Sequence, residues 1–278
     1  MTARAAAPHR NWKRLNRLAF NGLRRLSAML LCVLLVALLF WRYKQASPRD
    51  MAWWRVEQTG ILRVGMDTSY PPFSALADDG PFGLDVDLAH EIGLRLGVQV
   101  AITPMGIDGL YDSLRTNQVE ALVSALSFDP GRTGDVIYTR PYLDAGQILV
   151  SRSGIARMEQ LEGKSVAVEY GAVGDELARR WVRRLATLEV THFIEPDEAL
   201  AAAETGSADA ALVDAVSARL YLRAHPDSPL RLAPESVQAD LYVVATALGS
   251  RELAGKINAA LEAMADDGTL ATLLAKWL

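Results

Sequence analysis

The chain has 278 residues, half of them apolar, which suffices for one large domain or two smaller lobes with a buried core. Its formal charge of −4 is unevenly distributed, because residues 1–50 carry ten Lys and Arg against one acidic residue, and the rest carries 19 basic and 32 acidic groups. That acidic excess argues against a nucleic-acid partner, since a phosphate backbone requires a basic surface. The single Cys32 excludes a disulfide framework, and the four histidines lack metal-ligand spacing, so we predict no metal and no cofactor.

An uncharged apolar segment lies near the N-terminus, from Leu26 to Trp41. Arg24 and Arg25 precede it, and basic residues on one side of such a segment keep that end in the cytoplasm. No small-residue cleavage site follows closely, so we favour an uncleaved signal anchor, with a cleaved signal peptide as the alternative. The predicted organisation is a basic cytoplasmic segment over 1–25, a transmembrane signal anchor over 26–41, a linker over 42–57, and a periplasmic or extracellular remainder.

From Gly60 onward, strand and helix patterns alternate. The apolar run "ILRVGMD" predicts a strand that ends at Asp67, because the prolines of "YPPF" cannot continue a strand. Apolar residues from Leu84 to Leu96 predict a helix that Gly97 ends. "VQVAIT" and "VEALVSAL" predict further strands, with a helix over "GLYDSLRTNQ" between them. This alternation predicts an α/β domain with a largely parallel sheet, in which ligands bind beyond the carboxyl ends of the strands.

A second α/β unit follows the first. Its predicted strands end at Glu169 and Asp214, with a third strand over "LEVTHF" and helices over "GDELARRWVRRL" and "PDEALAAAETG". "ADLYVVATAL" predicts one more strand, and two closing helices are separated by residues 266–268.

Eight segments in this order resemble the periplasmic solute-binding proteins of the polar amino acid uptake family. They are "LRVGMDTSYPPF", "GLDVDLAHEIGLRLG", "DGLYDSL", "EALVSALSFDPGR", "YTRPYLDAGQILV", "LEGKSVAVEYG", "ADAALVDAVSARLYL" and "ADDGTLATLLAKWL". The resemblance implies a Venus flytrap fold of two lobes, each a mostly parallel sheet flanked by helices. Lobe 1 would comprise 58–150 plus 240–278 and lobe 2 would comprise 151–239, with crossings near "GQILVS" and "QADLYVV".

The chemistry of an amino acid ligand agrees with this resemblance. Its carboxylate requires a bidentate cation and its ammonium requires an anion. Arg132 suits the carboxylate, Asp214 suits the ammonium from the opposite lobe, and Ser127 would reach both ends of the ligand. Two charges on different lobes would couple binding to closure. Asp214 as a helix N-cap is the structural alternative.

The resemblance implies further ligand contacts. Asp67 and Glu169 match positions near the ligand side chain, and two carboxylates there favour a cationic or strongly polar side chain. Ala125 and Val173 depart from the family, which often has hydroxyl residues there. The predicted ligand-binding residues are Asp67, Tyr70, Ile107, Ser124, Ala125, Ser127, Arg132, Glu169, Val173 and Asp214.

We therefore predict a monomeric, membrane-anchored binding protein, not an enzyme, that delivers an amino acid or similar zwitterion to an ABC permease. A periplasmic dehydratase of the same fold, acting on prephenate or arogenate with Glu169 as the acid, is one alternative. A ligand-sensing ectodomain that works with a separate partner is the other.

Overall fold

The computed structural model describes residues 29, 31–40 and 50–278, and the chain divides into two units, 1–49 and 50–278. Residues 31–40 are helical and exposed. No helix within the described residues has the length and hydropathy needed to cross a membrane. The predicted cytoplasmic segment 1–25 lies outside the described residues, as does part of the predicted anchor and linker.

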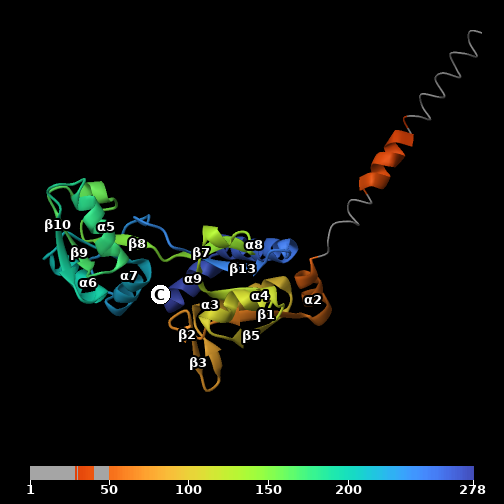
Figure 1. The fold of residues 1–278 in the computed structure, drawn as a ribbon. Helices are drawn as coiled ribbons and strands as arrows, with labels where there is room; N and C mark the ends of the chain where they lie inside the picture. The colour runs from red at the N-terminus through yellow and green to blue at the C-terminus, as the bar shows by residue number, and fades with distance from the viewer. Residues whose placement is uncertain (1–28, 30, 41–49) are drawn as a thin grey trace, which may run out of the picture. The chain divides into compact units, whose positions relative to one another are not determined.

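Residues 50–278 contain two five-stranded sheets, each flanked by helices (Figure 1). The first sheet has the strand order β5-β1-β6-β13-β7 and the second has the order β10-β9-β11-β8-β12. The strands of the first sheet are β1 (Ile61–Met66), β5 (Gln99–Pro104), β6 (Ala121–Ser127), β7 (Val136–Asp144) and β13 (Leu241–Ala247). Those of the second are β8 (Gln147–Ser151), β9 (Ser165–Glu169), β10 (Glu189–Phe193), β11 (Ala210–Asp214) and β12 (Arg231–Leu232).

Both sheets are mixed, which corrects the prediction of mostly parallel sheets. In the first, β5, β1 and β6 run parallel, but β13 pairs antiparallel with both β6 and β7. In the second, β10, β9 and β11 run parallel, but β8 pairs antiparallel with β11 and β12. The antiparallel pairs in these two sheets all involve β8 or β13, the strands that adjoin the segments connecting the two sheets. An antiparallel pair does not need the helical crossover that a parallel pair requires.

The helices pack their apolar sides against these sheets. α3 and α8 contact the first sheet, and α5, α6 and α7 contact the second, so each sheet has its own core. Apart from α2, which is described below, the α-helices of residues 50–278 are α3 (Leu84–Leu96), α4 (Leu110–Arg115), α5 (Val173–Val182), α6 (Pro196–Thr205), α7 (Ala215–Ala224), α8 (Arg251–Asp266) and α9 (Thr269–Trp277). These helices confirm the helical segments predicted from apolar periodicity. The short strands β2 (Ser69–Tyr70), β3 (Ser74–Ala77) and β4 (Gly80–Phe82) form a small antiparallel sheet that was not predicted.

Two segments connect the sheets, and they are hydrogen-bonded to each other. The first runs from the end of β7 into β8, and the second returns before β13 (Figure 1). The backbone N–H of Ala145 donates to the carbonyl of Asp240 at 2.8 Å, and that of Gln147 donates to Gln238 at 2.8 Å. The Asp144 carboxylate also accepts from the backbone N–H of Asp240 at 3.0 Å. The two connections therefore form one hydrogen-bonded crossing.

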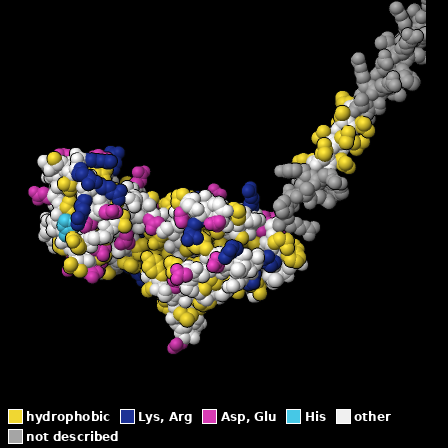
Figure 2. Space-filling model, viewed as in Figure 1, with side chains coloured by type: hydrophobic (Ala, Val, Ile, Leu, Met, Phe, Trp, Pro, Cys, Tyr) yellow, Lys and Arg dark blue, Asp and Glu magenta, His cyan; other side chains and the backbone are white. Residues whose placement is uncertain are grey.

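Figure 2 shows basic side chains gathered over α5 on the visible face of the second lobe. The sequence of α5 and the turn after it contains Arg179, Arg180, Arg183 and Arg184. The first two pair with acidic side chains four residues earlier on the same helix, at 2.7 and 3.3 Å. Part of this local positive charge is thereby offset within the helix.

Helix α2 (Met51–Thr59) occupies residues that we assigned mostly to a linker. Ala52, Trp53 and Val56 are buried, at the spacing of one helical face. Asp50 begins the helix, because its Oδ1 accepts from the backbone N–H groups of Ala52 and Trp53, both at 3.0 Å. The segment is short, but the Asp50 cap stabilises its first turn and its apolar face packs into the core of the first sheet.

Asp50 also caps a second helix. Its Oδ2 accepts from the backbone N–H groups of Glu252 and Leu253, at 2.8 and 3.0 Å, in the first turn of α8. One carboxylate therefore satisfies unpaired donors at two helix N-termini, and Glu252 in the second helix is 202 positions from Asp50 in sequence.

We expect Asp50→Ala to lower the free energy of unfolding by about 2 kcal/mol, since a single side-chain cap contributes about 1 kcal/mol. Asp50→Asn should have an intermediate effect, because its one amide oxygen can accept at only one of the two helices. Urea denaturation would measure both, with Asp78→Ala at an exposed site as the charge-matched control. Equal stabilities of Asp50→Ala and Asp78→Ala would contradict the double cap.

Candidate functional site

The predicted site residues lie where strands of both sheets end. Asp67 follows β1, and Ser127 is the last residue of β6 in the first sheet. Glu169 and Asp214 are the last residues of β9 and β11 in the second sheet. These positions are the carboxyl ends of parallel strands, where an open α/β sheet exposes a crevice.

In the first sheet, the ends of β1 and β6 are joined directly. The backbone N–H of Asp67 donates to the Ser124 hydroxyl at 2.9 Å. The Asp67 carboxylate accepts from the backbone N–H and the hydroxyl of Ser69, at 3.0 and 2.7 Å, so it caps the turn after β1. Ser127 is exposed and lies opposite Tyr242 of β13 in the strand register. The Ser127 side chain is therefore accessible to solvent at this end of the sheet.

Arg132 follows β6 in a short 3-10 helix and is held by weak contacts. Its guanidinium lies 4.3 Å from the centre of the Tyr111 ring, and its Nε is 3.4 Å from the Asp129 carboxylate. The side chains of Arg132 and Asp129 are both about half exposed, at 47% and 51%. An ion pair of that length and exposure is worth little, so the guanidinium remains able to bind a ligand carboxylate.

In the second sheet, Asp214 ends β11 and caps α7, as the structural alternative predicted. Its Oδ1 accepts from the backbone N–H groups of Val216 and Ser217, at 3.0 and 2.8 Å. Both of these bonds use the same oxygen, which orients the carboxylate and leaves Oδ2 outside the cap. Capping and ligand binding are therefore compatible at this residue.

Val173 begins α5, and the loop before it is fixed by a buried carboxylate. Asp175 accepts from the backbone N–H of Gly171 at 3.0 Å and from Arg179 at 2.7 Å. The Arg179 guanidinium holds the pKa of Asp175 well below its usual range. The Gly171 N–H is thus already engaged.

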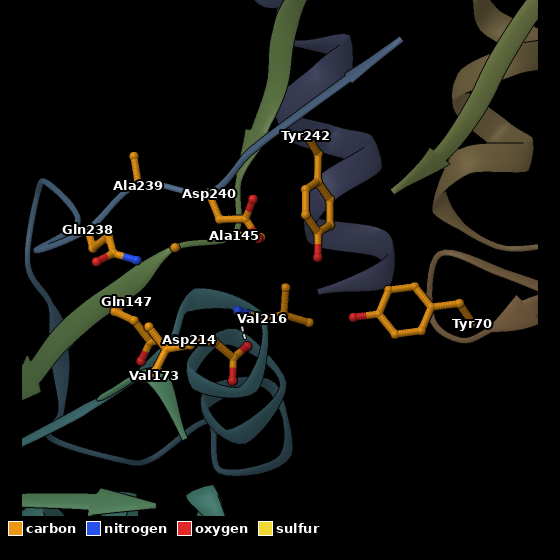
Figure 3. Close-up of a pocket in the computed structure, with 11 residues that line it drawn as sticks. Tyr70, Ala145, Gln147, Val173, Asp214, Val216, Gln238, Ala239, Asp240 and Tyr242 are labelled. Atoms are coloured by element: carbon orange, nitrogen blue, oxygen red, sulfur yellow. Dashed lines mark hydrogen bonds between the residues drawn. The ribbon is translucent and has the colours of Figure 1, made fainter. Parts of the chain in front are cut away.

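A pocket of about 270 Å³ lies beside the crossing (Figure 3). The hydroxyls of Tyr70 and Tyr242 point toward the same space as the Asp214 carboxylate. Its lining residues are Tyr70, Ala145, Gly146, Gln147, Val173, Asp214, Val216, Gln238, Ala239, Asp240 and Tyr242. None of these eleven is basic, whereas Asp214 and Asp240 are carboxylates. The pocket therefore suits a ligand with a positive group.

The structure brings only part of the predicted set to this pocket. Tyr70, Val173 and Asp214 line it. Ile107 is 64% exposed at the start of the turn after β5. The predicted residues that do not line the pocket are Asp67, Ile107, Ser124, Ala125, Ser127, Arg132 and Glu169.

The pocket residues that we did not predict come mainly from the crossing. Gln147, Gln238 and Asp240 lie on the two connecting segments, and Tyr242 lies at the start of β13. The family resemblance implied crossings near "GQILVS" and "QADLYVV", and this was the one available signal for these residues.

Burial and neighbouring carboxylates raise the pKa values of two groups around the site. Burial raises the pKa of Glu169, and the nearby Asp214 and Glu195 raise it further. Burial also raises the pKa of Tyr242, with smaller effects from Tyr70, Asp240 and Asp214. Negative charge is thus concentrated here, and a cation would relieve it.

One buried carboxylate lies behind the site. Burial raises the pKa of Asp85 to about 7, against the opposing effects of its hydrogen bonds with Tyr142 and Ala125. The pKa of this group is near 3.9 in an unfolded chain. Asp85 therefore favours the folded state most below about pH 4, and this contribution is lost as the pH rises toward 7.

Two mixed α/β sheets, a double crossing and a polar pocket beside it define the class of periplasmic-binding-protein folds. Residues 62–278 match the model of the bacterial extracellular solute-binding proteins, family 3, and the chain belongs to that family. It is accordingly an extracytoplasmic solute-binding protein, and the predicted family resemblance is confirmed.

Known relatives agree with this assignment. The chain is 29% identical over 229 residues to the L-cystine-binding protein TcyJ of Escherichia coli strain K12, covering 80% of this chain and 84% of that protein. The structure of an ancestral cationic amino acid solute binding protein, AncCDT-1, is 29% identical with a TM-score of 0.58, covering 80% of this chain and 97% of that one.

An enzymatic function finds support only at the level of fold. The structure of an ancestral cyclohexadienyl dehydratase, AncCDT-3(P188L), is 24% identical with a TM-score of 0.68, covering 80% of this chain and 94% of that one. Similarity at that level shows a shared fold alone. Family membership identifies the chain as a binding protein and not an enzyme, as predicted.

Proposed function

We propose that this protein captures an amino acid with a cationic or strongly polar side chain and delivers it to an ABC transporter. The observation that carries the proposal is the pocket, which has two carboxylates and no basic residue among its lining side chains. The two relatives named above, an L-cystine-binding protein and a cationic amino acid solute binding protein, support an amino acid ligand.

Each end of the ligand has a candidate partner. Asp214, with its second carboxylate oxygen outside the helix cap, would bind the α-ammonium. Arg132 would bind the α-carboxylate through its guanidinium, and the exposed Ser127 would complete the hydrogen bonds. Because the two charges belong to different sheets, a ligand that binds both would stabilise a closed arrangement.

Glu169 and Asp240 would set the preference for the ligand side chain. The raised pKa of Glu169 arises from burial and from Asp214 and Glu195, so an additional carboxylate on the ligand would be repelled. A cationic side chain would instead offset this negative charge. Val173, which lacks a hydroxyl, would leave the ligand contact there to the backbone, whereas the Ala125 N–H already donates to Asp85.

Calorimetric titration of the refolded domain, residues 50–278, with arginine, lysine, cystine, glutamine and glutamate tests this function. We expect heat of binding from one or more of the first four amino acids and none from glutamate. Binding of glutamate alone would contradict the proposed specificity, and binding of no amino acid would contradict the function.

We further propose that residues 26–41 anchor the protein in the cytoplasmic membrane. The sixteen uncharged residues after Arg24-Arg25 support an anchor, as does Trp41 at the far end. The full chain should therefore stay with membranes after an alkaline carbonate wash. Release into the soluble fraction, with a mature N-terminus after residue 41, would instead indicate a cleaved signal peptide.

A further inference from the structure

Asp85 is a buried carboxylate with no role in the proposed ligand contacts. It lies in the first turn of α3, and it is fully buried, with 0% exposure. Its Oδ2 accepts from the backbone N–H of Ala125 at 2.6 Å, and its Oδ1 accepts from the Tyr142 hydroxyl at 2.7 Å. A buried carboxyl carries a large desolvation cost, so its retention at this place requires an explanation.

These two bonds and one backbone bond reach three segments around the site. Ala125 belongs to the end of β6, two residues before Ser127. Tyr142 lies on β7, just before the crossing. The backbone N–H of Asp85 itself donates to the Phe73 carbonyl at 2.9 Å, in the turn that carries Tyr70. Asp85 therefore lies at the junction of the three parts of the first lobe that approach the ligand.

The start of α3 is built for this close approach. Gly83 has φ 133°, and a Cβ there would lie 2.6 Å from the Phe73 carbonyl carbon and 2.9 Å from the Ser74 Cα. Only glycine allows the two backbones to come so close. This packing brings the following turn of α3, with Asp85, directly beneath the end of β6.

Ala125 adopts a conformation that its own side chain disfavours. Its φ is 44°, in the left-handed region, which costs a non-glycine residue about 1 kcal/mol or more. At the same place the register of β6 with β13 shifts, between Val243 and Ala245. Such a bulge re-aims the residues that follow it. The Ala125 N–H is held by a side chain, Asp85, instead of the strand ladder.

We propose that Asp85 is the positioning residue of this half of the binding site, because its carboxylate holds the bulge at Ala125 and thereby sets the direction of Ser127 and of the segment that carries Arg132. This inference rests on the proposed function for its effect on affinity, but the geometry of the bulge is independent of any ligand. Asp85 acts on the ligand only through the β6 backbone.

Substitutions at Asp85 and Tyr142 separate positioning from general stability. In Asp85→Asn, the amide oxygen can still accept from Ala125, and the amide nitrogen can donate to the Tyr142 oxygen. Asp85→Ala removes both bonds. Tyr142→Phe removes only the tyrosine bond and leaves the Ala125 bond in place, so it is the matched control for lost stability.

Nuclear magnetic resonance of the ¹⁵N-labelled full chain in detergent provides the readout. In the native protein, we expect the Ala125 amide proton to shift with a midpoint near pH 7, following the Asp85 carboxyl, and to stay constant in Asp85→Asn. Tyr142 is the titratable side chain bonded to Asp85, and its own pKa is raised by burial, so it stays neutral in this range. An Ala125 amide proton whose chemical shift is the same in the native protein and in Asp85→Asn at every pH would overturn the proposal, even if Asp85→Ala failed to fold.

The affinity for L-arginine completes the test. We expect Asp85→Ala to weaken it by about tenfold or more, and Asp85→Asn and Tyr142→Phe to stay within about threefold of the native protein. An equal loss in Asp85→Ala and Tyr142→Phe would show that Asp85 acts through stability alone and would overturn the proposal. If arginine binds none of the proteins, the proposed specificity fails, but the amide measurement still decides the role of Asp85.

Discussion

Substitution of Arg132 by alanine is expected to weaken binding of an α-amino acid by about 100-fold or more. Removing one member of a desolvated, hydrogen-bonded charge pair costs about 2–5 kcal/mol. In the structure the guanidinium rests on Tyr111 and makes only a 3.4 Å contact with Asp129, so little else would be lost with it. Calorimetry with L-arginine, and with any other ligand found in the panel of amino acids, would measure the change.

Arg140→Ala is the matched control for this experiment. Arg140 also lies on the first lobe, with 42% side-chain exposure and a 3.3 Å contact with Glu262, and it is not among the predicted site residues. Its substitution changes the net charge equally and should leave the affinity unchanged. Arg132→Lys should recover only part of the binding, because an ammonium lacks the planar fork that matches a carboxylate. Unchanged affinity in Arg132→Ala would show that the ligand carboxylate binds elsewhere.

Gly146→Ala is expected to lower the free energy of unfolding by about 3 kcal/mol and the melting temperature by several degrees. Gly146 lies at the crossing, where a Cβ would contact the Gln238 carbonyl oxygen and lie 2.6 Å from the Asp240 nitrogen and 2.7 Å from the Ala239 Cα. All three are backbone atoms of the returning segment, so they cannot move aside as a flexible side chain would. The methyl group must therefore separate the two connections.

The same substitution should also reduce ligand affinity, because the crossing supplies much of the pocket lining. Gly134→Ala is the control, since a Cβ at Gly134 meets no atom within 4 Å and its backbone is not in the left-handed region. Thermal unfolding and calorimetry of both variants would measure the two effects. If Gly146→Ala and Gly134→Ala behaved alike, the two connecting segments would not be packed as closely as described.

Local patterns in the sequence were sufficient to predict most of the secondary structure. The stripe from Leu84 to Leu96 predicted α3 with both ends correct, and the apolar run ending at Asp67 predicted β1. Helix α2 was missed, although Asp50 and Gly60 mark its two ends. It has only nine residues, so it is stable only when its apolar face packs against the core, and that packing cannot be read from the sequence.

The pocket could be predicted only in part, for a similar reason. Polar residues at strand ends were visible in the sequence, and Tyr70 and Asp214 do line the pocket. Asp240 and Gln147 were not visible, because they face the pocket only where two distant segments pair beside the second lobe. Ala125 was noted only as a missing hydroxyl, and its left-handed backbone depends on a side chain 40 residues away.

The sequence by itself determined the charge division, the order of strands and helices, and the polar strand ends at which a binding site is expected, because periodicity and turn chemistry are local properties of a chain. The tertiary structure alone decided that both sheets are mixed, that the crossing lines the pocket, and that Asp85 holds the bulge at Ala125. These features depend on contacts between residues far apart in sequence, such as Asp144 and Asp240, which are 96 positions apart, and such contacts form only when the whole chain packs.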